Sequence, residues 1–284
     1  MRFLSAPAGT LQCILTGSLA AIVLTATGCG APALSSQPQQ MAVPVKASAD
    51  ASASSNANLA SASSTPSVLL FTGTGTSSGD VSAVEAILKT LSLSYATADS
   101  TKMDNLTEAD LKVYKLLIVP GGNSITIGEN LSTNATTAIR NAVTKDGMHY
   151  LGLCAGAFFG GYSIHNGVNL TSGKWFDFYE DEYDGIHKEG VLVTLSNKSQ
   201  LDIYWQDGPQ LSAWGTVVAK YPDGTSAIVE GKSGNGWVIL SGVHPEAPAS
   251  WWYGMKQPTK LSVDLAYAGT LVTAALNGTT LPHY

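Results

Sequence analysis

Cys154 stands in a run of small residues that suits a catalytic nucleophile. The segment Gly152-Leu153-Cys154-Ala155-Gly156-Ala157 follows an apolar stretch and has the form of a sharp turn between a strand and a helix. Such a turn exposes the side chain at its tip and needs small neighbours, and the helix that follows favours the thiolate form of a cysteine. Taken alone, the segment is also compatible with a small buried cysteine in a glycine-rich turn.

His244 and Glu246 could activate such a thiol. They belong to the segment Gly242-Val243-His244-Pro245-Glu246, which follows the apolar run 237–240. Pro245 keeps His244 extended, so the side chains of His244 and Glu246 can project to the same side. The imidazole would take the thiol proton and the carboxylate would orient the ring, as in a catalytic triad. The alternative is an exposed loop in which the two residues are incidental.

Two adjacent glycines could stabilise the negative charge that develops on a carbonyl oxygen during acyl transfer. Gly121 and Gly122 lie in the turn Pro120-Gly121-Gly122-Asn123 after an apolar run. Their backbone N–H groups, together with that of Ala155, could form an oxyanion hole. A simple turn is the alternative for this motif.

Strands and helices alternate in the part of the chain that carries these motifs. Short apolar runs at 67–71, 116–119 and 149–153 predict strands, and a further strand is expected at 94–97. Helices are expected over 78–91, where apolar residues recur at three- and four-residue spacing, and over 133–144. This order predicts an α/β fold, in which a mostly parallel, flavodoxin-like sheet has helices on both faces. Ligands of such sheets bind beyond the carboxyl ends of the strands, so Cys154 and the glycine pair are expected to be neighbours.

The following part of the chain is richer in strand patterns. Residues 191–195, 201–205 and 217–219 have strand character, and a hairpin is expected around the Ser233-Gly234-Asn235-Gly236 segment. An amphipathic helix is expected over 259–276. We assign the substrate pocket to four residues, namely Phe158, Trp205, Gln206 and Asp207. For the aromatic residues Trp205, Trp251, Trp252 and Tyr253, a place in the core or at the rim is the alternative to a pocket wall.

The N-terminal segment has the pattern of an export signal. Arg2 precedes the apolar stretch 11–24, which is too short to span a bilayer, so residues 1–28 are expected to be a signal peptide. Ala26-Thr27-Gly28-Cys29 resembles a bacterial lipobox, which predicts lipidation of Cys29; an ordinary cleaved signal is the alternative. Residues 29–66, rich in Ala, Ser, Gln and Pro, are expected to be a disordered tether, and 67–284 the folded domain.

The charge composition argues against nucleic-acid binding. Only 13% of the 284 residues are charged and the net charge is -6, with Lys and Arg scattered, so nucleic acid is not an expected partner. Processing at Cys29 would leave Cys154 as the single free thiol of the mature chain. We expect no cofactor and no metal: a cluster of carboxylates at 177–184 is interpreted as a solvated loop.

The three motifs, in this order over residues 68–246, resemble the class I glutamine amidotransferase-like superfamily. The resemblance implies a triad of Cys154, His244 and Glu246. Closer still, four segments resemble the N-terminal domain of biotin-protein ligases, in its stand-alone bacterial lipoprotein form: Phe71-Thr72-Gly73-Thr74-Gly75-Thr76-Ser77, Val119-Pro120-Gly121-Gly122, Gly152-Leu153-Cys154-Ala155-Gly156-Ala157-Phe158-Phe159 and Tyr204-Trp205-Gln206-Asp207-Gly208-Pro209. Glutamine-using members commonly carry glutamine where this chain has Phe158, which argues against glutamine as the substrate.

The sequence therefore predicts an amidase or acyl-transfer hydrolase of the bacterial cell envelope. A lipid on Cys29 would anchor it to a membrane, facing the periplasm or the exterior, and its partner would be a small-molecule substrate. The alternative function is a lipoprotein that binds a small ligand in the same pocket without turnover.

Overall fold

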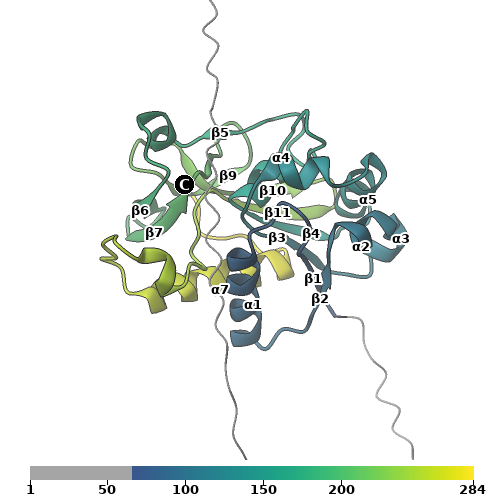
Figure 1. The fold of residues 1–284 in the computed structure, drawn as a ribbon, viewed down its shortest axis with the longest axis horizontal. Helices are drawn as coiled ribbons and strands as arrows, with labels where there is room; N and C mark the ends of the chain where they lie inside the picture. The colour runs from purple at the N-terminus through teal and green to yellow at the C-terminus, as the bar shows by residue number, and fades with distance from the viewer. Residues whose placement is uncertain (1–65) are drawn as a thin grey trace, which may run out of the picture. The chain divides into compact units, whose positions relative to one another are not determined.

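The computed structural model describes residues 66–284, which form a nine-stranded sheet with helices on both faces (Figure 1). The predicted signal peptide, Cys29 and the tether up to residue 65 lie outside the described residues. No helix in the described part of the chain is long and apolar enough to cross a membrane.

Five parallel strands form one half of the sheet, in the order β2-β1-β3-β4-β11. Their bounds are Tyr95–Ala98 (β2), Val68–Phe71 (β1), Leu116–Val119 (β3), His149–Leu153 (β4) and Gly236–Ser241 (β11). Strands β1, β3 and β4 are apolar on both faces, as expected for parallel strands covered by helices on either side. The predicted mostly parallel core is confirmed.

The β-rich segment continues the same sheet instead of forming a separate layer. Its four main strands are antiparallel and follow β11 in the order β10-β9-β6-β7. Their bounds are Ser226–Ser233 (β10), Thr216–Lys220 (β9), Lys188–Leu195 (β6) and Gln200–Gln206 (β7), while the short strands Asp177–Phe178 (β5) and Pro209–Gln210 (β8) pair with each other. Strand β7 also contacts the loop that follows β11: the His244 N–H group donates to the Tyr204 carbonyl oxygen at 2.8 Å.

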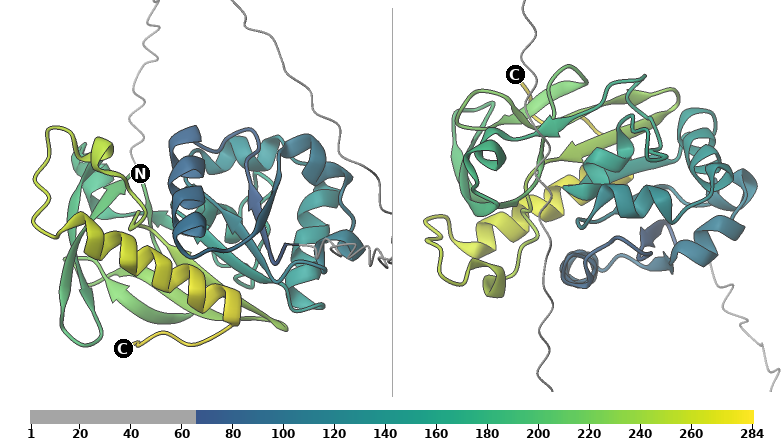
Figure 2. Two further views of the ribbon diagram at one scale, coloured as in Figure 1. Left: turned by 90° about the horizontal axis from the view of Figure 1, so that it is seen from below. Right: turned by 45° about the horizontal axis from the view of Figure 1, so that its top comes forward.

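Two helices cover one face of the sheet, and five shorter ones cover the other. Helices α1 (Ser78–Thr90) and α7 (Leu261–Asn277) pack on the face formed by Val68, Leu70 and their neighbours, and Figure 2 shows α7 in yellow running along the sheet. The opposite face is covered by α2 (Ser100–Asn105), α3 (Glu108–Leu111), α4 (Ser124–Glu129), α5 (Thr133–Thr144) and α6 (Ala155–Gly160). Because side chains alternate along a strand, each strand of the parallel core contributes to both apolar layers.

The carboxyl ends of β1, β3, β4 and β11 lie at one edge of the sheet, since these strands are parallel neighbours. The loops that leave this edge carry the predicted site residues. Two single-turn 3₁₀ helices, η1 (Glu180–Asp184) and η2 (Ala249–Trp252), lie in loops that also contribute to the site described next.

Candidate active site

Cys154 occupies a strained position between β4 and α6. Its backbone has φ 49° and ψ −106°, a conformation that costs a non-glycine residue on the order of 1–3 kcal/mol. The Cys154 N–H group donates to the Ser241 carbonyl oxygen at 2.7 Å, which ties the turn to the end of β11. Gly156 is required two residues later, because a Cβ atom there would overlap the carbonyl oxygen of Val119. This geometry is that of a nucleophile elbow.

The Cys154 side chain points toward strand β7 and the loop after β11. Its Sγ–H group donates to the Gln206 carbonyl oxygen at 3.4 Å, and the side chain is almost fully buried. The sulfur also lies within interaction range of the His244 imidazole. The structure therefore brings together two residues that are 90 positions apart in the sequence.

His244 is held in place by its backbone and by a carboxylate. The residue is 3% exposed, and its Nδ1 atom lies 2.9 Å from Oε1 of Glu246, which is also buried. The side chain of Trp251 packs edge-on against the imidazole, with 5.6 Å between ring centroids. Glu246 thus lies where it can orient the imidazole, and His244 lines the same cavity as Cys154.

Asp80 is a second buried carboxylate beside the imidazole, and our sequence analysis did not identify it. Its Oδ1 atom lies 3.2 Å from Nδ1 of His244. Asp80 comes from the first turn of α1, where its N–H group donates to Oγ of the N-cap residue Ser77. An acidic residue three positions after a serine is typical of a helix start. In the sequence, this pattern alone explains an aspartate at position 80, so it gave no sign of the contact with His244.

The charges around His244 favour its protonated form. Burial opposes protonation, but the electrostatic influence of Cys154 and Glu246 and the side-chain interactions with Asp80 and Cys154 outweigh it and raise the pKa of the imidazole well above its usual value. Burial likewise opposes ionisation of Asp80, yet the hydrogen bond and positive charge of His244 lower the pKa of that carboxyl group. A positively charged imidazole near a cysteine is an arrangement found at reactive cysteines.

Two of the three predicted oxyanion-hole residues line a cavity at Cys154. Gly122 and Ala155 line a cavity together with Cys154. Gly121 has a packing role that the sequence did not reveal: a Cβ atom there would overlap Oδ1 of Asp80 and lie 2.7 Å from Cε1 of His244. The glycine pair therefore leaves room for the carboxylate and the imidazole.

Of the four predicted pocket residues, three face cavities at Cys154. Phe158 lines a cavity of about 790 Å³, Gln206 lines a smaller one of about 360 Å³, and Asp207 lines both. The prediction for Trp205 was wrong, because this side chain is fully buried in the core and its Nε1–H group donates to the Gly208 carbonyl oxygen at 3.2 Å. Neighbouring residues of a strand face opposite sides, so Gln206 and Trp205 cannot share the pocket.

The aromatic residues near the C-terminus divide in the same way. Trp251 and Tyr253 line the smaller cavity, whereas Trp252 is buried against Tyr204. Tyr204 is a further residue of this wall that the sequence analysis missed; its hydroxyl group donates to Oε1 of Gln206 at 2.7 Å.

Two groups of side chains in the described residues bring metal-ligating atoms together: Asp80, His244 and Glu246, and a rim cluster formed by Glu182, His187 and Asp207. In the rim cluster, Nδ1 of His187 lies 3.2 Å from Oε2 of Glu182 and 3.1 Å from Oδ1 of Asp207. Hydrogen bonds to these two carboxylates raise the pKa of His187, so the three side chains satisfy one another.

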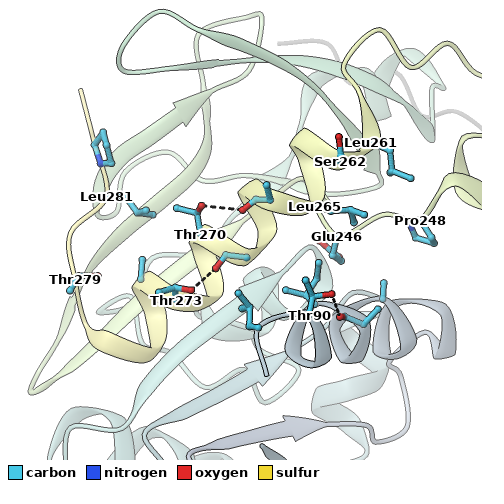
Figure 3. Close-up of a pocket in the computed structure, with 18 of the residues that line it drawn as sticks. Thr90, Glu246, Pro248, Leu261, Ser262, Leu265, Thr270, Thr273, Thr279 and Leu281 are labelled. Carbon is cyan, nitrogen blue, oxygen red and sulfur yellow. Dashed lines mark hydrogen bonds between the residues drawn. The ribbon is translucent and has the colours of Figure 1, made fainter. Parts of the chain in front are cut away.

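A third cavity, of about 940 Å³, lies between α1 and α7 behind the site (Figure 3). Figure 3 shows Glu246 at one end of it, beside Leu265 and Pro248, and the hydroxyl groups of Thr90, Thr270 and Thr273 are bonded within their own helices. Neither Cys154 nor His244 lines this cavity, so the nucleophile is reached from the opposite side of Glu246.

Comparison with known proteins agrees with this architecture. Residues 66–185 match the family model described as "Biotin-protein ligase, N terminal". A biotin–protein ligase of Schizosaccharomyces pombe is 26% identical over 47% of this chain and 26% of its own length. An uncharacterised protein of Chlamydia muridarum is 27% identical over 46% of this chain and 60% of its own. The aligned region thus spans less than two thirds of either relative.

A solved glutamine amidotransferase structure has the same fold. It superposes with a TM-score of 0.53 and 20% identity, covering 75% of this chain and all of the other. The described part of the chain therefore has the class I glutamine amidotransferase-like fold, and its residues 66–185 are similar to the N-terminal domain of biotin-protein ligases.

Proposed function

We propose that the protein is a hydrolase that cleaves an amide or a related acyl bond through a covalent thioester at Cys154. The observation that carries this proposal is a buried histidine that contacts two carboxylates through Nδ1 and lines the same cavity as Cys154. A buried cluster of three ionisable groups around a strained cysteine is costly for folding and is typical of active sites.

The residues have separate tasks in the proposed reaction. His244 takes the proton of the Cys154 thiol, and the thiolate attacks the carbonyl carbon, so that a C–S bond forms and the carbonyl electrons move to the oxygen. N–H groups at Gly122 and Ala155 stabilise this oxyanion. As the intermediate collapses, the bond to the leaving group breaks and the imidazolium donates its proton to the leaving atom. Glu246 and Asp80 are positioning residues, since they act through the imidazole.

The thioester is then hydrolysed by the same groups in reverse roles. His244 takes a proton from water, the hydroxide attacks the carbonyl carbon, and the C–S bond breaks with return of the proton to sulfur. The products are the carboxylic acid and the free thiol. Water is the only co-reactant that the two steps require.

A stoichiometric acylation experiment tests the proposal. We expect p-nitrophenyl acetate to release a burst of one nitrophenolate per chain, with the acetyl group found by mass spectrometry on the peptide that contains Cys154. Cys154→Ser should abolish the burst, and His244→Ala should slow it at least a hundredfold. Acetylation of Cys154 no faster than that of glutathione, or acetylation indifferent to His244, would exclude catalysis and favour a pocket that only binds a ligand.

We further propose that the chain is anchored in the bacterial cell envelope by a lipid on Cys29. The apolar stretch 11–24 and the small residues before Cys29 support this proposal. Radioactive palmitate fed to the expressing bacterium should label the full chain, and Cys29→Ser should abolish the label. Full labelling of the Cys29→Ser variant would contradict the anchor.

A further inference from the structure

Cys154 lies where two cavities of different chemistry meet. Both are lined by Gly122, Cys154 and Asp207. The larger, of about 790 Å³, is called the aromatic cavity here because its walls include Phe158, Phe159, Trp175, Phe176 and Phe178. The smaller, of about 360 Å³, is called the polar cavity because most of its lining side chains are polar or charged, although Tyr204, Trp251 and Tyr253 also line it. Its polar and charged residues include Ser77, Asp80, Lys188, Gln206, His244 and Ser250.

The position of His244 decides which part of a substrate enters which cavity. His244 lines the polar cavity and not the aromatic one. In acyl transfer the imidazolium must donate its proton to the leaving atom, so the leaving group has to lie on the side of the imidazole. The acyl group is then directed to the other cavity at Cys154, which Ala155 also lines.

The aromatic cavity suits a large apolar group. Phe158 and Phe178 pack edge to face with 5.1 Å between ring centroids, and Trp175 and Ile164 at the rim are 63% and 83% exposed. Large apolar side chains at this exposure around a concave surface are typical of ligand sites. In the rim cluster, the carboxylates of Glu182 and Asp207 are both in contact with His187. We therefore expect the aromatic walls to make the main contacts with a ligand in this cavity.

We propose that the substrate is an amide of a large apolar or aromatic acyl group with a small polar amine, and that Cys154 transfers the acyl group from that amine to water. This inference rests on the proposed function and specifies its substrate class. The acyl chain is buried in the aromatic cavity, and each Å² of apolar surface that is removed from water contributes about 25 cal/mol to the binding free energy. The polar cavity holds the amine within reach of the imidazole.

Chloromethyl ketones of different size test the inference on the full-length protein. The thiolate displaces chloride from the CH₂ group, and the other substituent of the ketone takes the place of the acyl chain. We compare chloroacetone with 1-chloro-4-phenylbutan-2-one and divide each alkylation rate constant of Cys154 by the rate constant for glutathione. The normalised rate with the phenyl compound should be at least ten times that with chloroacetone.

Two exposed aliphatic residues provide a matched pair of variants. Ile164→Glu places a carboxylate at the rim of the aromatic cavity and should lower the ratio of the two rates at least threefold. Val113→Glu makes the same kind of change at an exposed residue that lines neither cavity, and should leave the ratio as it is. Both residues are exposed enough for the variants to fold.

The outcomes separate the substrate class from the proposed function. A ratio near one, or a ratio that Ile164→Glu does not change, would overturn the inference about the acyl group. The proposed function is judged by a different comparison, namely whether His244→Ala slows alkylation by both compounds. A ratio near one with strong dependence on His244 would leave the hydrolase intact and remove only its apolar specificity.

Discussion

Oδ1 of Asp80 lies 3.2 Å from Nδ1 of His244, the same nitrogen that Oε1 of Glu246 contacts at 2.9 Å. Two carboxylates from opposite ends of the domain sequence therefore share one imidazole nitrogen. Asp80 is fixed by the N-cap of α1, and Glu246 by the loop after β11. Both carboxylates thus act on the same nitrogen, and each favours the protonated form of the imidazole.

The first prediction concerns Asp80→Asn. Loss of this negative charge should lower the pKa of His244 and reduce the thiolate fraction at Cys154, so iodoacetamide labelling at pH 6.5 should slow about three- to tenfold. Glu246→Gln should have an effect of the same sign. If the two carboxylates act through one nitrogen, the double variant will lose less than the product of the two single losses. Labelling of Asp80→Asn at the unchanged rate would show that Asp80 is only structural.

The second prediction concerns the space at Gly121. A Cβ atom in Gly121→Ala would overlap Oδ1 of Asp80 and press on the imidazole of His244, so the carboxylate and the ring must move apart. We expect labelling of Cys154 to slow at least tenfold, while circular dichroism shows a folded protein. The matched variant is Gly269→Ala, described next, which should keep the normal labelling rate. Fast labelling of Gly121→Ala would mean that the site tolerates the shift.

The third prediction is a gain in stability at Gly269. This residue lies inside α7, and a Cβ atom there would meet only Leu91 Cδ2 at 3.5 Å, an ordinary contact. Gly269→Ala should raise the free energy of unfolding by about 0.5–1 kcal/mol, or roughly 2 °C in Tm. Gly128→Ala in α4 should do the opposite, because its Cβ atom would overlap the carbonyl oxygen of His165. Urea denaturation of both variants measures the difference.

The fourth prediction is a pH dependence of stability at Asp264. Burial raises the pKa of this carboxyl group to about 6, with a further contribution from Asp202, and its Oδ1 atom has no hydrogen-bond partner in the described residues. Between about pH 4 and 6 the folded state therefore binds more protons than the unfolded state, so stability falls as the pH rises. Asp264→Asn should increase the free energy of unfolding by on the order of 2 kcal/mol at pH 7.5 and change it little at pH 4.

An exposed aspartate gives the control for this measurement. Asp146→Asn alters the charge in the same way at a solvated position, and the difference between its unfolding free energies at pH 4 and pH 7.5 should match that of the unchanged protein. A stability profile of Asp264→Asn parallel to that of the unchanged protein would contradict the fourth prediction.

Local patterns predicted most of the scaffold. The strands β3 and β4 and the helix α5 begin and end where the sequence analysis predicted them. The sequence of each element is enough to predict it. Continuous apolar runs are typical of parallel strands that are covered on both faces, and helical spacing of apolar residues is typical of a helix with one buried face. Short helices such as α2 and α4 were missed, because six residues carry too little periodicity to be recognised.

The site was predicted only where the motif is local. The turn at Cys154 and the pair His244 and Glu246 are short segments, and the parallel order of the strands that precede them brings the segments together. Asp80 was missed because its tertiary contact lies with residues more than 160 positions away, while its local pattern is that of a helix cap. Trp205 was wrongly assigned to the pocket because the motif around it does not indicate which side chains of β7 face the core.

The rate of iodoacetamide labelling of Cys154 tests the central claim most directly, because it reports whether the buried imidazole activates the sulfur. The full chain and His244→Ala are labelled at pH 6.5, and the peptide that contains Cys154 is quantified by mass spectrometry. We predict that the unchanged protein reacts at least thirtyfold faster than His244→Ala. Equal rates in the two proteins would contradict the assignment of Cys154 as an activated nucleophile.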